Sequence, residues 1–284
     1  MKLKLKLMAA AVALAASAGA ANANIVTGAS GNSELVLFAF DVPTNATSMW
    51  DLGVFMDHFL TTTPAVNNPG AQIQWNLNTG AISANAFAAG YAGATGATAA
   101  DYGGGTALSQ IAAYGAANVR WGVIALDSLN PMRFLTTSWF DYETVATTDP
   151  TNITAFSLSN NFLAAHNLLG NHSGVAHGAS HATTGNGRQD QGFGAEDWLG
   201  KMAVTATGAV GEQLSFYSLA TTPAGGADYR QHGAGPGFHG QWGFDMAGGT
   251  LTYAVPIPEP SEYALMLAGL GMLGFMVRRR MRQQ

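Results

Sequence analysis

Cysteine is absent from this chain of 284 residues, and charged residues make up only 10% of it. The absence of cysteine excludes a disulfide framework, a thiolate metal site and a cysteine nucleophile. The low charge disfavours intrinsic disorder, because disordered chains combine high charge with few aromatic residues. Aromatic residues are 10% of this chain. The sequence therefore predicts a folded protein that is stabilised by packing alone.

Basic residues are scarce in the long central part of the chain. The whole chain contains 12 lysines and arginines and 17 acidic residues. Seven of the basic residues but only two of the acidic ones lie in residues 1–23 and 256–284, so the part between them has a net charge of about −10. An acidic surface disfavours binding to nucleic acid and to anionic membranes. We expect no nucleic-acid partner.

Residues 1–23 have the pattern of a secretory signal peptide. Three lysines precede an apolar run over residues 8–18, and Ala21 and Ala23 form an A-x-A cleavage site. We expect export through the inner membrane and cleavage after Ala23. The alternative interpretation is an uncleaved anchor.

The end of the chain begins with a stiff segment in which alternating prolines fix the backbone and remove amide donors. Its motif residues are Val255, Pro256, Pro258, Glu259, Pro260 and Ser261. An uncharged apolar run of 15 residues follows, at 263–277. At about 1.5 Å per residue the run covers about 22 Å, which is less than a hydrocarbon core of about 30 Å.

A basic cluster ends the chain: Arg278, Arg279, Arg280 and Arg282. Arginine side chains reach the lipid headgroups and so lengthen a short span, and they favour the cytoplasmic side. We therefore predict a single membrane-spanning helix over residues 263–277 that these arginines stop. A buried C-terminal core helix is the alternative interpretation.

The proline segment, the short apolar helix and the arginine cluster, in this order, resemble the PEP-CTERM sorting signal of Gram-negative bacteria. The resemblance covers only residues 255–284. It implies that an exosortase, which is a membrane transpeptidase, recognises the Pro-Glu-Pro segment and cuts near it. It also implies a final location at the cell surface or outside the cell, with a link to exopolysaccharide and the biofilm matrix.

Residues 24–255 are expected to form a β-rich extracellular domain. Short strands separated by glycine turns predict an antiparallel sandwich or jelly-roll arrangement with one or two short helices. Strands are expected at residues 34–41, 72–77, 119–126, 133–138, 202–206, 214–217, 238–244 and 251–255. Helices are expected at residues 52–60, 106–118 and 149–170.

Histidines gather in a glycine-rich stretch at residues 171–194, which we expect to be a loop. His172, His177 and His181 are weak candidates for zinc or copper ligands, because imidazole is the commonest transition-metal ligand. Their spacing matches no zinc motif. The more ordinary interpretation is a solvated polar loop without a cofactor.

Three further patterns are weaker. Asp190, Glu196 and Asp197 offer oxygen ligands for calcium, but they lack the EF-hand spacing, and a surface loop is the ordinary interpretation. The segment around Ser180 resembles the G-x-S-x-G elbow of hydrolases, but it ends in alanine and no strand is expected before it. Trp75 lies between two amides and fits either sugar stacking or, more ordinarily, a core position.

We expect an exported protein without enzymatic activity, structural or exopolysaccharide-associated in a biofilm. The alternative is a secreted metal-dependent hydrolase that acts on matrix polysaccharide and uses the His/Asp stretch at residues 166–197.

Overall fold

The computed structural model describes residues 24–27, 31–61, 68–85, 100–127, 129, 132–138, 159–190, 207–221, 227–232, 239–257 and 260–281. The strands are β1 (Glu34–Asp41), β2 (Thr47–Phe55), β3 (Gln72–Asn76), β4 (Ile82–Ala84), β5 (Val119–Asp127), β6 (Arg133–Ser138), β7 (Ala179–Ala182), β8 (Gly208–Ala209), β9 (Gln213–Thr221), β10 (Ala227–Gln231), β11 (Gln241–Asp245) and β12 (Thr250–Ala254). The α-helices are α2 (Met56–Thr61), α5 (Thr106–Ala112), α6 (Ser159–His166) and α7 (Pro260–Met281). Short 3₁₀ turns lie at Gly103–Gly105, Ala116–Asn118 and Gly185–Gly187.

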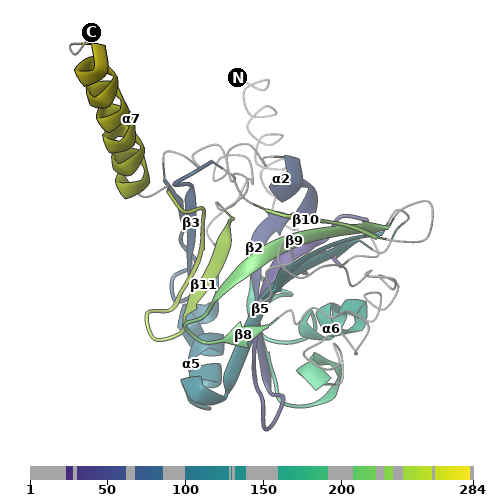
Figure 1. Ribbon diagram of the computed structural model, residues 1–284. Helices are drawn as coiled ribbons and strands as arrows, with labels where there is room; N and C mark the ends of the chain where they lie inside the picture. The colour runs from purple at the N-terminus through teal and green to yellow at the C-terminus, as the bar shows by residue number, and fades with distance from the viewer. Residues whose placement is uncertain are drawn as a thin grey trace, which may run out of the picture.

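All these strands belong to one curled antiparallel sheet (Figure 1). Its order is β4-β3-β12-β11-β9-β6-β5-β1-β2-β7, with β10 beside β9 and β8 beside β5. The mainly β, antiparallel class is confirmed. The finer sandwich or jelly-roll arrangement stays a prediction, because the strands form a single hydrogen-bonded sheet.

Strand β1 lies inside the sheet between β2 and β5, and it is buried on both faces. Alternate residues therefore enter two different cores, which explains why the sequence of β1 is a continuous apolar run. Leu35, Leu37 and Ala39 pack in the main core inside the curl. Val36, Phe38 and Phe40 pack in a second core on the other face. The strand predicted at 34–41 is confirmed.

The curl brings β11 against β2 and β5 inside the main core. The ring of Phe244 lies 6.3 Å from that of Trp50 and 5.7 Å from that of Trp121. The Trp75 indole N–H donates a 3.0 Å hydrogen bond to the carbonyl of Leu52. Trp75 is fully buried, so its ordinary interpretation as a core residue is confirmed.

Helix α6 covers the second core. Phe162 is fully buried and meets Phe38 edge-to-face at 5.9 Å. Burial of such a side chain stabilises the fold by about 1.5–3 kcal/mol. The amide of Asn167, just after the helix, bonds the backbone of Ile25 at 2.7 and 2.9 Å and so fastens the start of the domain.

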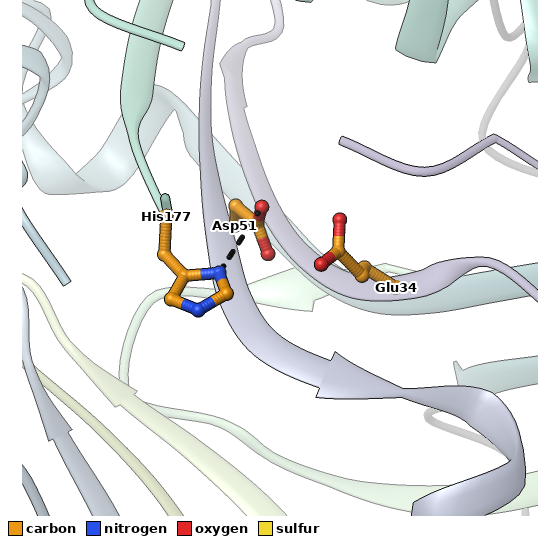
Figure 2. A group of neighbouring side chains, drawn as sticks. All are labelled: Glu34, Asp51 and His177. Carbon is orange, nitrogen blue, oxygen red and sulfur yellow. Dashed lines mark ion pairs between the residues drawn. The ribbon is translucent and has the colours of Figure 1, made fainter. Parts of the chain in front are cut away.

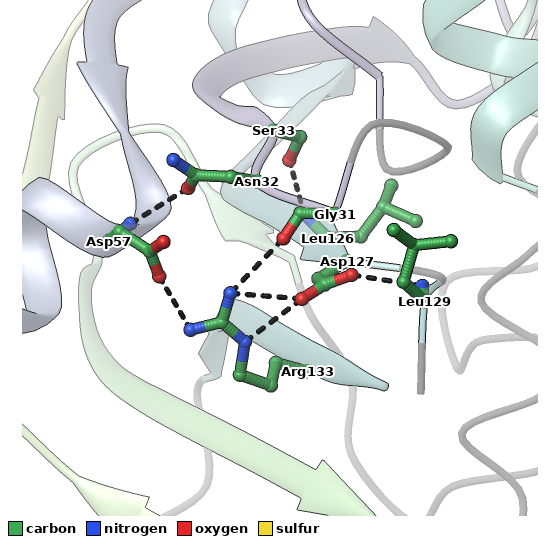
Figure 3. A network of polar contacts seen from close by, with 8 residues as sticks. All are labelled: Gly31, Asn32, Ser33, Asp57, Leu126, Asp127, Leu129 and Arg133. Carbon is green, nitrogen blue, oxygen red and sulfur yellow. Dashed lines mark hydrogen bonds and ion pairs between the residues drawn. The ribbon is translucent and has the colours of Figure 1, made fainter. Parts of the chain in front are cut away.

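A polar network holds the turn between β5 and β6 against the start of α2 (Figure 3). The guanidinium of Arg133 bonds Asp127, Asp57 and the carbonyl of Gly31. Asp127 also accepts a 2.9 Å bond from the N–H of Leu129. One arginine thereby joins three segments that are distant in the sequence.

Two expected elements are wrong in part. Residues 52–55 belong to strand β2, and the helix begins only at Met56. The alternation of Trp50, Leu52 and Val54 decides the conformation, because it places these side chains in the main core while β2 pairs with β1. The expected loop at 171–194 contains strand β7, which extends the sheet beyond β2.

Other expected elements are confirmed or shortened. Strands at 119–126, 133–138, 214–217 and 251–255 are found, the last two in β9 and β12. Helix α5 ends at Ala112, well before residue 118, and α6 covers only part of the helix expected at 149–170. Residues 149–158 and the strand expected at 202–206 lie outside the described residues.

Helix α7 projects away from the sheet (Figure 1). The side chains of Leu265, Met266, Leu267, Leu270, Met272 and Leu273 are all more than half exposed. In the part of the chain that the structure describes, no helix is both long enough and apolar enough to cross a membrane. Helix α7 includes the predicted residues 263–277, and its role as a membrane span stays a prediction. The predicted signal peptide lies outside the described residues.

Candidate functional site

The boundary between the β domain and the C-terminal segment is sharp. Val255 is only 2% exposed, and its N–H and C=O bond Ala71 and Gly70 at 2.9 Å. Pro256 and Ile257, which follow directly, are exposed. Val255 thus belongs to the domain, and the free segment begins at Pro256.

The proline segment leads directly into helix α7. Pro260 is the first residue of the helix, a position that suits proline because the first helical N–H groups have no intrahelical acceptor. Ser261 follows it inside the helix. At the other end, Arg278 and Arg279 are exposed, and Arg280 lies in the same last turns. The remaining predicted residues, Pro258, Glu259, Arg282, Ala21 and Ala23, lie outside the described residues.

His172 is a core residue, which corrects its interpretation as part of a solvated loop, and His166 at the end of α6 is a core residue as well. His166 and His172 are fully buried around Ser180 of β7. His166 Nε2 donates to the carbonyl of Gly187 at 2.8 Å, so its Nδ1 accepts the Ser180 hydroxyl proton at 2.7 Å. His172 Nε2 then donates to Ser180 Oγ at 3.1 Å. This chain of hydrogen bonds engages the serine, which is 2% exposed.

Burial lowers the pKa of both histidines. The pKa of His166 falls to about 3, chiefly through desolvation, against the effect of its bond to Gly187. The pKa of His172 falls to about 4 for the same main reason, while the negative charge of Asp51 opposes the shift. Both rings are therefore neutral at physiological pH and act as hydrogen-bonding core groups.

His181 lies near His166 and His172 but makes different contacts. Its Nδ1 lies 2.8 Å from Ser48 Oγ, which itself donates to the carbonyl of Ala107. The ring stacks on Tyr114 at 6.1 Å, and burial lowers the pKa of the imidazole. His181 thus joins β7 to β2 and α5.

His177 is the histidine that meets carboxylates. It precedes β7, and its ring approaches Asp51 of β2 and Glu34 of β1 (Figure 2). One donor atom of each of these three residues lies within 4.8 Å of the other two. Asp51 is fully buried, Glu34 is 4% exposed, and the His177 side chain is 13% exposed. We call these three residues the carboxylate–histidine cluster.

The electrostatics of this cluster are those of buried facing carboxyls. Burial raises the pKa of Glu34 well above its ordinary value, and the negative charge of Asp51 raises it further. The hydroxyl of Tyr102 donates to the backbone carbonyl of Asp51 at 2.8 Å. Burial, followed by the charge of Asp51, also raises the pKa of this phenol. The raised pKa of Glu34 favours the protonated form of this carboxyl group beside Asp51.

A β-bulge shapes the cluster. Glu34 pairs with Phe55 but Val36 pairs with Asp51, so β2 has extra residues at this point. Gly53 lies in the bulge with a φ of 68°, in the left-handed region. A Cβ at this position would lie 3.0 Å from the His177 ring, so the glycine serves both the backbone and the close approach of the imidazole.

Sequence patterns identified only His177 of this cluster. The sequence does not assign Glu34 and Asp51 to this cluster, because neither residue shares a local motif with the histidine. Glu34 begins the apolar strand β1, and Asp51 interrupts the apolar strand β2. The one available signal is Glu34 at the start of an apolar run that predicts a buried strand. Asp51 precedes an expected helix and gives no such signal. Among the other candidates, Asp190 forms a 2.9 Å ion pair with Arg188. Glu196 and Asp197 lie outside the described residues.

The chain is a curled antiparallel β domain followed by a proline segment and an exposed helix that ends in arginines. This is the arrangement of a protein that carries a C-terminal signal outside its folded domain. Residues 256–280 match the family model of the PEP-CTERM protein-sorting motif. This motif indicates an exported protein that an exosortase sorts, with a cell-surface or extracellular location after processing. No curated protein and no solved structure matches the chain.

Proposed function

We propose that this protein is a non-enzymatic component of the extracellular matrix, whose β domain associates with exopolysaccharide once an exosortase has removed the C-terminal helix. The observation that carries the proposal is the position of the sorting motif. It begins at the residue after Val255, where the backbone hydrogen bonds of the domain end. Cleavage near the Pro-Glu-Pro segment therefore releases the domain with every strand that the structure describes.

One face of the sheet supports the association with polysaccharide. In an antiparallel sheet, directly paired residues project to the same side. The pairs Thr252–Gln74 and Thr250–Asn76 place uncharged polar side chains beside one another on β12 and β3, and Gln72 is paired with Ala254. Gln241 of β11 pairs with Ala254 and extends this face. We call this surface the amide–hydroxyl face: Gln72, Gln74, Asn76, Gln241, Thr250 and Thr252.

The chemistry of the amide–hydroxyl face suits neutral sugars. Its side chains are exposed or half-buried, whereas Ile73, Trp75 and Tyr253 on the opposite side are buried. Amide and hydroxyl groups both donate and accept hydrogen bonds, as sugar hydroxyls do. Shallow depressions along β11 and β12 are lined by Gln241 and Thr252. The negative charge of the domain favours neutral over anionic polymers.

Co-sedimentation of the exported protein with exopolysaccharide from its own host tests this proposal. We expect binding without any shortening of the polymer. The double variant Gln74→Ala, Thr252→Val, which alters two paired residues of the face, is expected to weaken binding at least tenfold. Gln110→Ala, an exposed glutamine on α5, serves as the matched control. Equal binding by both variants, or depolymerisation by the unaltered protein, contradicts the proposal.

A further inference from the structure

The carboxylate–histidine cluster joins three separate segments inside the domain (Figure 2). Glu34 comes from β1, Asp51 from β2 and His177 from the turn before β7. The main chain fixes each segment. The N–H of Glu34 bonds the carbonyl of Val26 at 3.1 Å, and the N–H of Asp51 bonds the carbonyl of Gly178 at 3.0 Å. The carbonyl of His177 accepts a 2.9 Å bond from the N–H of Asp101. The three side chains therefore converge from rigid positions.

Two atoms of the cluster are buried without a hydrogen bond, namely Asp51 Oδ2 and His177 Nδ1. They lie 3.6 Å apart, which is too far for a hydrogen bond between them. A buried polar atom without a partner destabilises the fold, and more so when it is charged. A fully buried carboxylate oxygen that points at an unpaired imidazole nitrogen thus marks a position for a third participant.

Backbone donors orient both carboxyl groups toward this position. The N–H of Gly53 bonds Asp51 Oδ1 at 2.9 Å, which leaves Oδ2 directed at the histidine. The N–H of Val26 bonds Glu34 Oε2 at 2.8 Å. In metal sites, ligating carboxylates are typically held in position by such hydrogen bonds.

The spacing of the donor atoms fits a small cation. Two ligand atoms about 2.0 Å from a zinc ion at the tetrahedral angle lie about 3.3 Å apart. The observed 3.6 Å between Asp51 and His177 is close to this value, and all three donors lie within 4.8 Å of one another. A divalent cation also compensates the negative charge of two carboxylates that face each other in a buried position.

We propose that Glu34, Asp51 and His177 form a binding site for one divalent transition-metal ion of the zinc type. Carboxylate oxygens and imidazole nitrogens both bind zinc, and zinc sites with three protein ligands keep a fourth position for water. Calcium requires six to eight oxygen ligands, so it suits this set less well. The ion reaches the site past His177, the most exposed member, and ties β1, β2 and β7 together.

Zinc titration of the full exported chain, purified in detergent and freed of metal with EDTA, tests the site. Isothermal titration is expected to give one zinc per chain and a rise in the thermal midpoint, with no such response to calcium or magnesium. Loss of an outer partner alone costs about 10–100-fold in metal affinity, so removal of a ligand is expected to cost more than about 100-fold. His177→Gln and Asp51→Asn are the two test variants.

His181→Gln is the matched control, because this histidine lies in the same region but outside the cluster. We expect its zinc affinity to remain within about twofold of the unaltered protein. If Asp51→Asn fails to fold by near-ultraviolet circular dichroism, His177→Gln decides, since His177 is partly exposed and its replacement leaves no deep cavity. Absence of zinc binding, preference for calcium, or unchanged zinc affinity in His177→Gln overturns the proposal. None of these outcomes bears on sorting or on polysaccharide binding.

Discussion

At the scale of single residues, Gly53 has a backbone position that suits only glycine. Its positive φ disfavours any side chain by roughly 1–2 kcal/mol, and a Cβ there would press on the His177 ring. We predict that Gly53→Ala lowers the free energy of unfolding by about 2 kcal/mol or more. Urea denaturation followed by tryptophan fluorescence measures the change.

Gly243→Ala is the control for this substitution. Gly243 lies in β11, has no positive φ, and a Cβ there meets no atom within 4 Å. Alanine is expected to be neutral or slightly stabilising, because it reduces the freedom of the unfolded chain. Equal destabilisation by both substitutions would mean that the bulge at Gly53 is not as described.

The burial of His166 predicts how the stability of the protein depends on pH. Its pKa is about 3 in the folded protein and about 6.5 when exposed. Above pH 6.5 both states hold a neutral ring, so His166 contributes no pH dependence there. Below pH 6.5 only the unfolded state gains a proton, so stability falls, by about 2 kcal/mol at pH 5 from this residue.

Urea unfolding at pH 7.5 and pH 5 measures this effect in the unaltered protein and in His166→Gln. The variant is expected to be less stable at pH 7.5, because it loses part of the hydrogen-bond chain through Ser180. It is also expected to lose about 2 kcal/mol less between the two pH values. An identical pH slope in both proteins would show that His166 titrates normally.

The sequence predicts residues of the candidate sites only where those residues are close together along the chain. The sorting motif is contiguous, so it was predicted correctly from its prolines and arginines. The carboxylate–histidine cluster depends on a strand register and a bulge, which no local pattern encodes. The burial of His172 is not predictable from the sequence, because its glycine-rich flanks are typical of loops, whereas here this segment leads into strand β7 and the histidine is fully buried.

At the scale of secondary-structure elements, Arg133 joins the β5–β6 turn to α2 (Figure 3). Its loss leaves Asp127, whose side chain is 7% exposed, without its cationic partner. We predict that Arg133→Met lowers the free energy of unfolding by about 2–3 kcal/mol. The partial exposure of Arg133 itself, 29%, keeps the cost below that of a fully buried pair.

Arg188→Met is the matched comparison in chemical denaturation. Arg188 pairs with Asp190 at 2.9 Å, but both side chains are about 30% exposed. Solvent-accessible ion pairs contribute about 0–1 kcal/mol, so the expected loss is smaller. A cost equal to that of Arg133→Met would contradict the importance assigned to the network.

Elements were predictable where one periodicity dominated. The alternation around Trp75 predicted β3, and the apolar run predicted β1. Residues 52–60 satisfied the helical spacing and the strand alternation together, and only pairing with β1 assigns 52–55 to the strand. The curl of the sheet rests on contacts such as Trp50 with Phe244, which join segments far apart in the sequence.

At the scale of the whole molecule, the β domain and helix α7 are expected to be energetically independent. The described apolar side chains of α7 are exposed, and the domain's last hydrogen bonds are those of Val255. We predict that a chain ending at Val255 unfolds within about 0.5 kcal/mol of the longer protein in urea. A larger loss of stability would show that the C-terminal segment packs on the domain.

The central claim is that residues 256–280 are a sorting signal attached to a domain that does not need them for folding. The most direct measurement is mass spectrometry of the protein's C-terminus from an exosortase-bearing host and from the same host without its exosortase. The account predicts extracellular protein that lacks the peptides of α7 in the first host, and retained protein with an intact α7 in the second. An intact C-terminus at the same location in both hosts would contradict it.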